Sequence, residues 1–125
     1  MLKKKYRILI VEDEPSIAQL YRFKLEREGY FVSVAYNGEE GLNECKKSIF
    51  DLVLLDLRMP VMNGEDMLER LRSSDQGSKT KVIVLTNISK DEAPAKLRFL
   101  DVERYIVKAH HTPKQIVDII EEVLA

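Results

Sequence analysis

Hydrophobic residues along the chain gather into five short runs, separated by stretches with helical spacing. The runs are residues 8–11, 31–35, 52–55, 82–85 and 104–107. Three of them, 8–11, 52–55 and 82–85, are unbroken rows of aliphatic side chains, which is typical of strands covered on both faces. The run at 31–35 alternates more, as a half-exposed edge strand does. The pattern therefore predicts five strands.

A stretch with apolar residues at helical spacing follows each run. Pro15 and Pro113 suit the first turns of the first and last of these helices, and Thr112 begins the pattern of a capping box. The fourth helix is acceptable only if Pro94 lies in its first turn. The expected apolar faces are Ile17, Leu20, Tyr21 and Leu25; Leu42, Cys45 and Ile49; Met67, Leu68 and Leu71; Ala93, Leu97 and Leu100; and Ile116, Ile119, Ile120, Val123 and Leu124.

Strand and helix alternate five times, which predicts one α/β domain over residues 1–125. We expect a single doubly wound parallel sheet with five helices on its two faces. Of the two common strand orders for such sheets, five strands favour 2-1-3-4-5, the flavodoxin-like order. Ligands of these sheets bind beyond the carboxyl ends of the strands. The residues that close the predicted strands are therefore the candidates for chemistry.

Composition narrows the class of partner and compartment. The 20 Lys and Arg side chains nearly balance the 21 Asp and Glu side chains, so charge does not favour nucleic acid or membrane as a partner. Cys45 is the only cysteine, which excludes an internal disulfide and fits a reducing cytoplasm. The basic residues 1–6 precede an apolar run too short for a signal peptide or a membrane span. We expect a cytoplasmic protein.

Polar side chains close four of the five predicted strands. They are Glu12-Asp13, Asp56, Thr86 and Lys108. Because parallel strands end at the same edge of a sheet, we expect these side chains to converge. Carboxylates about 4 Å apart repel by on the order of 4 kcal/mol at an effective dielectric of about 20, so three of them need positive partners. Lys108 supplies one positive charge, and Mg²⁺ or Mn²⁺ bound by oxygen atoms would supply the rest. This combination suits phosphoryl transfer to Asp56.

Each of these residues taken alone has an ordinary structural explanation. Acids at strand ends often cap the next helix, a threonine can satisfy backbone groups, and a lysine can pair with any acid. Their shared position at one edge of one predicted sheet favours function over coincidence.

Together the motifs resemble those of the receiver domain of two-component response regulators, over essentially the whole chain. The 2-1-3-4-5 order belongs to this family as well, so the expected order rests partly on the resemblance. The matching motifs are the acidic pair Glu12-Asp13, the phosphoacceptor Asp56, the following loop with Met59-Pro60 and Asn63-Gly64, the hydroxyl switch Thr86, the aromatic switch Tyr105 and the lysine Lys108.

The resemblance implies a phosphoryl donor and a metal ligand set. A histidine kinase or histidine phosphotransfer protein would phosphorylate Asp56, and the domain would promote only its own phosphorylation and dephosphorylation. Mg²⁺ would be bound by Asp13, Asp56 and the backbone carbonyl of Arg58, with Glu12 acting through water.

The resemblance also implies a switch. Thr86 would turn toward the phosphoryl group and Tyr105 would move into the vacated space. The surface made by the fourth helix, the fifth strand and the last helix would change, and an output protein or an effector domain would read it. The domain would be a monomer or a phosphorylation-dependent dimer. No DNA-binding element lies within these residues, and the chain ends at Ala125, so we expect either a stand-alone regulator or part of a longer one.

Several positions depart from the family pattern. Glu12 replaces the commoner aspartate, Asn87 stands where a very small residue is preferred, and Ala109 replaces the proline that usually follows the lysine. Asp101-Val102 stands where Gly-Ala is typical. The resemblance implies that Arg58, Asn87 and Ile88 tune the lifetime of the phosphoryl group, and the bulky, apolar Ile88 predicts slow self-dephosphorylation.

Three alternatives compete with a phosphorylated receiver. Asn87 and Ala109 favour a phosphorylation-independent interaction module, although the complete set of acids, Thr86 and Lys108 argues against it. A flavodoxin-like cofactor binder would need a phosphate-binding loop after the first strand, where Glu12-Asp13-Glu14 would repel phosphate. An aspartate-nucleophile phosphatase would want an acid at the position of Arg58.

Overall fold

The five predicted strands form one parallel sheet. The computed structural model describes residues 5–125, so residues 1–4 of the basic N-terminal segment lie outside it. Within the described residues the strands are β1 (Arg7–Val11), β2 (Phe31–Ala35), β3 (Leu52–Leu55), β4 (Lys81–Thr86) and β5 (Arg104–Val107). Their order is β2-β1-β3-β4-β5 and every pairing is parallel. The predicted fold class and strand order are confirmed.

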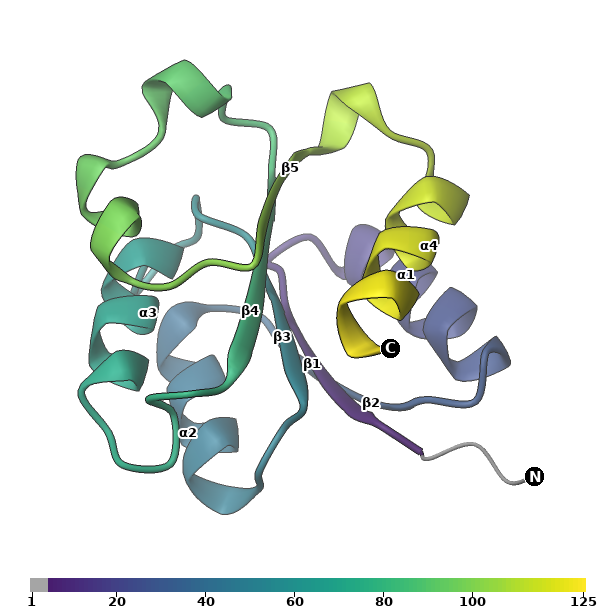
Figure 1. Cartoon of the computed structure of the whole chain (residues 1–125), viewed down its shortest axis with the longest axis horizontal. Helices are drawn as coiled ribbons and strands as arrows, with labels where there is room; N and C mark the ends of the chain where they lie inside the picture. Colours follow the sequence, from purple (N-terminus) through teal and green to yellow (C-terminus); the bar gives the residue numbers. More distant parts are fainter. Residues whose placement is uncertain (1–4) are drawn as a thin grey trace.

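Helices cover both faces of this sheet (Figure 1). The helices α1 (Pro15–Arg27) and α4 (Pro113–Leu124) pack on one face, and α2 (Gly38–Lys47) and α3 (Gly64–Arg72) pack on the other. Alternate residues of β1 divide between the two cores: Ile8 and Ile10 face α1 and α4, whereas Leu9 and Val11 face α2 and α3. This double coverage explains why the central strands are apolar without interruption.

The fourth predicted helix is wrong. Residues 87–103 instead contain two short 3₁₀ helices, η1 (Lys90–Glu92) and η2 (Ala95–Phe99), visible in green in Figure 1. Ala93 between them is extended, with φ −63° and ψ 143°. Pro94 lacks an N–H and disfavours helical geometry at the residue before it, so a continuous helix cannot pass through Ala93. The described residues thus hold four α-helices and not five, with a third 3₁₀ helix, η3, at Lys108–His110.

The helix starts are as predicted, whereas two side chains fall on the wrong face. Pro15 begins α1, and Thr112 forms a complete capping box at the start of α4. Leu20 is 42% exposed because the buried side of α1 follows Ala18, Tyr21 and Leu25, and Ile49 is 72% exposed because α2 ends before it.

Two further expectations concern Cys45 and the membrane. The Cys45 side chain is half-buried against the α2 and α3 side of the core, and burial raises the pKa of its thiol to about 11. Within residues 5–125 no helix combines the length and hydrophobicity that a membrane span requires.

Candidate functional site

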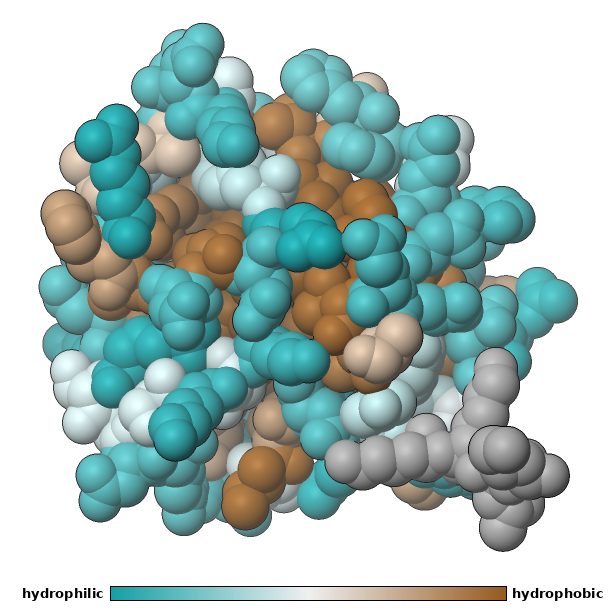
Figure 2. Space-filling view, viewed as in Figure 1, coloured by the Kyte–Doolittle hydropathy of each residue, from teal (hydrophilic) through white to brown (hydrophobic). Residues whose placement is uncertain are grey.

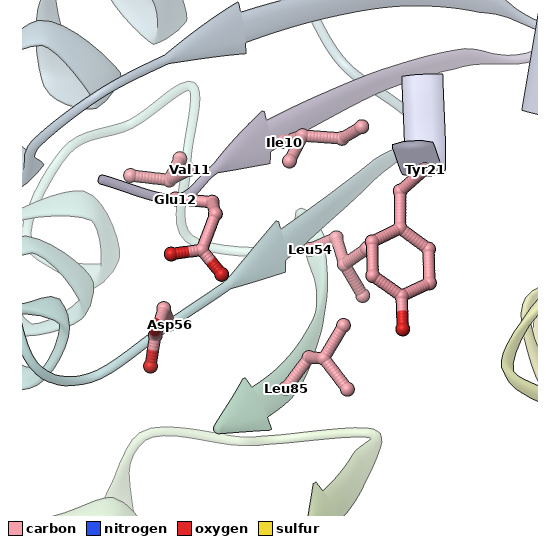
Figure 3. A pocket seen from close by; sticks show the side chains of 7 residues that line it. All are labelled: Ile10, Val11, Glu12, Tyr21, Leu54, Asp56 and Leu85. Carbon is pink, nitrogen blue, oxygen red and sulfur yellow. The ribbon is translucent and has the colours of Figure 1, made fainter. Parts of the chain in front are cut away.

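The parallel register brings the ends of β1 and β3 side by side. Val11 pairs with Leu55, and the Asp56 N–H donates a 3.0 Å hydrogen bond to the Val11 carbonyl. The next side chains, Glu12 and Asp56, lie just beyond the two strand ends (Figure 3). Both are more than nine-tenths buried. The sheet topology alone therefore places two carboxylates together.

Lys108 directly follows the carboxyl end of β5, and its side chain extends to these carboxylates. Its Nζ atom donates to Oε1 of Glu12 and to Oδ2 of Asp56, the latter at 3.1 Å. One carboxylate oxygen each from Glu12, Asp13 and Asp56 lies within 4.8 Å of the others. We call these three residues the acidic cluster. The predicted convergence of the acids and Lys108 is confirmed.

Burial makes the charges of this site interdependent. A cavity of about 10 Å³ behind the carboxylates is lined mainly by the apolar side chains of Ile10, Leu54 and Leu85, with the Tyr21 ring beside them (Figure 3). Burial raises the pKa of the Glu12 carboxyl to about 7, the hydrogen bond from Lys108 opposes this rise and the charge of Asp56 adds to it. The positive charge of one lysine does not neutralise three carboxylates.

Burial also acts on Lys108, in the opposite direction. Burial alone would lower the pKa of the Lys108 ammonium group. The hydrogen bond to Glu12 and the charge of Asp56 outweigh it, so the pKa of Lys108 lies above its ordinary value. Lys108 therefore remains charged at neutral pH.

The donor set of the acidic cluster fits a hard divalent cation. Mg²⁺ binds oxygen ligands, usually one or two carboxylates with a carbonyl and waters. The cluster offers carboxylate oxygens at the spacing of a single ion, and one of its members, Asp13, is only half-buried. The three carboxylates also carry more negative charge than Lys108 can offset, which favours binding of a further cation.

Asp56 faces an open groove on its other side. The groove has a volume of about 390 Å³ and is lined by Asp56, Arg58, Thr86, Asn87, Ile88 and Glu92. We call it the Asp56 groove. The residues expected to tune the phosphoryl lifetime all line it, but their roles stay predictions. Glu92 was missed, because a continuous helix was expected in this region and the sequence gives no sign of which side chain would face Asp56.

The two expected switch residues are linked through the backbone N–H and the backbone carbonyl of one residue, Ile88. The Ile88 N–H donates to Oγ1 of buried Thr86 at 3.4 Å, and the Tyr105 hydroxyl donates to the Ile88 carbonyl at 2.8 Å. Burial, followed by the charge of Asp56, raises the pKa of Tyr105. Ile88 therefore connects the side chains of Thr86 and Tyr105 on the segment that leads into η1.

The loop after Asp56 is held by a close approach of α3. The Leu57 N–H donates to Oδ1 of Asp56 at 2.7 Å, and the Gly64 N–H donates to the Leu57 carbonyl at 2.9 Å. A Cβ atom at Gly64 would lie 2.1 Å from the Asp56 carbonyl oxygen. Asn63 caps α3 through its side chain. The close approach to Asp56 thus requires glycine at position 64, and Asn63 caps the helix that begins there.

Comparison with known proteins agrees with this geometry. The family model of the response regulator receiver domain matches residues 8–121. The chain belongs to this family. The receiver domain is 42% identical over 123 residues to the uncharacterized transcriptional regulatory protein YkoG of Bacillus subtilis (strain 168), covering 97% of this chain and 49% of that protein. It is 38% identical over 104 residues to the response regulator ArlR of Staphylococcus saprophyticus, covering 82% and 45%. The receiver domain spans about half the length of these relatives.

Solved structures share the fold. The chemotaxis response regulator CheY4 of Vibrio cholerae matches with a TM-score of 0.87 and 28% identity, over 96% of this chain and 99% of that one. The response regulator protein TrrA of Thermotoga maritima, solved in complex with Mg(2+)-BeF, matches with a TM-score of 0.82 and 31% identity, over 96% and 99%. The resemblance inferred from the sequence is confirmed.

Proposed function

We propose that residues 1–125 form a phosphorylation-controlled signalling domain in which Asp56 accepts a phosphoryl group from a histidine kinase or histidine phosphotransfer protein. The contact between the Lys108 ammonium and the carboxylate of Asp56, a residue that lines an open groove, is the observation that carries this proposal. A nucleophilic carboxylate next to a fixed cation is suited to attack a phosphoryl group, since the cation offsets charge on the transferring oxygens.

In the proposed transfer, a carboxylate oxygen of Asp56 forms a bond to phosphorus. The phosphorus–nitrogen bond to the donor imidazole breaks, and the imidazole leaves with the electron pair. The Leu57 N–H donates to Oδ1 of Asp56 and the Lys108 ammonium donates to Oδ2. The carboxylate is therefore oriented before the phosphoryl donor arrives. The Lys108 ammonium and the Thr86 hydroxyl would donate to the phosphoryl oxygens.

We propose that the acidic cluster binds Mg²⁺, through Asp13, Asp56 and the backbone carbonyl of Arg58, with Glu12 acting through water. The oxygen-rich donor set supports this proposal and would also accept Mn²⁺. When bound, the cation offsets the negative charge of the acids and of the incoming phosphoryl group.

Signalling would follow from the link through Ile88. When the Thr86 hydroxyl turns toward the phosphoryl group it leaves the Ile88 N–H, which frees the segment held by Tyr105. Tyr105 would then move into the space left by Thr86, altering the surface formed by η1, η2, β5 and α4. Figure 2, in the same view as Figure 1, shows hydrophobic residues between hydrophilic ones in the region of β5. Such a change is a population shift between two packings.

An output protein or an effector domain would read this surface, in a monomer or a phosphorylation-dependent dimer. The side chain of Phe99 at the end of η2 is 86% exposed and offers an apolar contact. The domain would promote only its own phosphorylation and dephosphorylation.

The test uses acetyl phosphate, or a beryllofluoride salt, with Mg²⁺. Wild type should gain the mass of one phosphoryl group from acetyl phosphate, and beryllofluoride should shift the amide spectra around Thr86 and Ile88. Asp56→Asn should do neither while keeping the fold. Absence of both effects in wild type under saturating conditions contradicts the proposal and favours the phosphorylation-independent interaction module, for which the exposed Asn87 in the groove is the supporting observation.

A further inference from the structure

Glu92 is a charged residue at the Asp56 groove that the proposed phosphoryl transfer does not use. It is the last residue of η1, its side chain is exposed, and it lines the groove together with Asp56 and Arg58. Neither Glu92 nor Arg58 forms an ion pair with another residue in the range 5–125. The charge of Glu92 is therefore not offset by a direct partner and acts on whatever enters the groove.

We infer that Glu92 is a specificity-determining residue that disfavours small anionic phosphoryl donors relative to a phosphohistidine carried by a protein. The inference rests on the proposed phosphorylation of Asp56. A small donor such as acetyl phosphate approaches the groove as a dianion and is repelled by the Glu92 carboxylate. A protein donor can place a positive side chain against Glu92, so the same carboxylate then aids docking.

Coulomb's law gives the size of the effect. We take about 8 Å as an order-of-magnitude separation between the Glu92 carboxylate and a donor in the groove. In water, one such charge changes the local concentration of a dianion by about sixfold and that of a monoanion by about two- to threefold. At an ionic strength of about 0.15 M, screening reduces the effect on a dianion to about twofold. The expected effect is thus modest, dependent on salt and dependent on donor charge.

The experiment compares initial rates of Asp56 phosphorylation by acetyl phosphate with Mg²⁺, followed by mass spectrometry at subsaturating donor. The variants are Glu92→Gln and the matched control Asp91→Asn. Asp91 lies in the same 3₁₀ helix and carries the same charge, but it lines a different groove with Pro94 and Arg104. Glu92→Gln should accelerate phosphorylation about sixfold at low salt and about twofold at an ionic strength of about 0.15 M. Asp91→Asn should change the rate much less.

A second donor separates electrostatics from a change in shape. Phosphoramidate carries less net negative charge than acetyl phosphate, so Glu92→Gln should accelerate it less. Equal acceleration by the two substitutions, or a Glu92→Gln effect independent of salt and donor, overturns the inference and leaves Asp56 as the phosphoacceptor. No phosphoryl incorporation into wild type overturns the proposed function and this inference with it.

Discussion

Gly64 is the position at which the smallest substitution should disturb the site most. A Cβ atom there would lie 2.1 Å from the carbonyl oxygen of Asp56 and 2.9 Å from Cα of Leu57. Both are backbone atoms of the segment that presents the Asp56 carboxylate, so no side-chain rotation can relieve the overlap. Gly64→Ala therefore forces the start of α3 away from Asp56 by about 1 Å, the shift needed to restore ordinary contact distances.

Three contributions set the change in the free energy of unfolding. The forced separation weakens the 2.9 Å hydrogen bond from the Gly64 N–H to the Leu57 carbonyl, a loss of about 1 kcal/mol. Overpacking adds about 1–3 kcal/mol. Alanine is the better helix former at this first residue of α3 and returns at most about 1 kcal/mol. Gly64→Ala should therefore destabilise the domain by about 1–3 kcal/mol.

Urea unfolding measures this change, and binding of beryllofluoride with Mg²⁺ measures the displacement of Asp56. Gly29→Ala is the control, because Gly29 has a φ of +96° but nothing within 4 Å of its Cβ position. Both variants should lose stability, the control by about 1–2 kcal/mol through backbone strain. Only Gly64→Ala should lose affinity for beryllofluoride. Wild-type stability and affinity in Gly64→Ala would refute the role of this close approach.

Three further substitutions or modifications test other contacts. The Arg72 guanidinium donates to four backbone carbonyls, which a lysine cannot reproduce, so Arg72→Lys should lower the free energy of unfolding by about 2–3 kcal/mol in urea titrations while Arg70→Lys, at an exposed position, changes it little. A wild-type urea midpoint for Arg72→Lys would contradict this. Tyr105→Phe leaves the Ile88 carbonyl without its 2.8 Å donor and should destabilise by about 1 kcal/mol, with beryllofluoride-induced amide shifts over residues 88–99 smaller than in wild type. Beryllofluoride-induced amide shifts equal to those of wild type would show that Tyr105 takes no part in the switch. Burial favours the neutral thiol of Cys45, so its rate of alkylation by iodoacetamide should keep rising to a pH of about 11, whereas in urea it should level off near the ordinary pKa of 9.0. A plateau near 9 in the folded protein would show that the thiol is not desolvated.

Much of the candidate site could be predicted from local sequence pattern. Runs of aliphatic residues that end on Glu12, Asp56, Thr86 and Lys108 place those side chains at one edge of any parallel sheet, whatever the details of packing. The Pro94 signal was also local, and it identified the one helix that did not form. Leu20 was wrongly expected on the buried side of α1, because the side of this helix that faces the sheet is set by its contacts with β1, β2 and α4.

The sequence by itself determined the class of fold and the meeting of the acids with Lys108, because the alternation of strands and helices is a local pattern and parallel strands end at one edge of their sheet. The expected strand order rested partly on the family resemblance. Only the tertiary structure decided that Glu92 and not Asp91 lines the Asp56 groove, and that Tyr105 meets the carbonyl of Ile88. Contacts of this kind join elements that lie far apart in the chain. They depend on how each helix or strand is rotated and placed against its neighbours. Packing sets this placement, and local sequence pattern does not encode it.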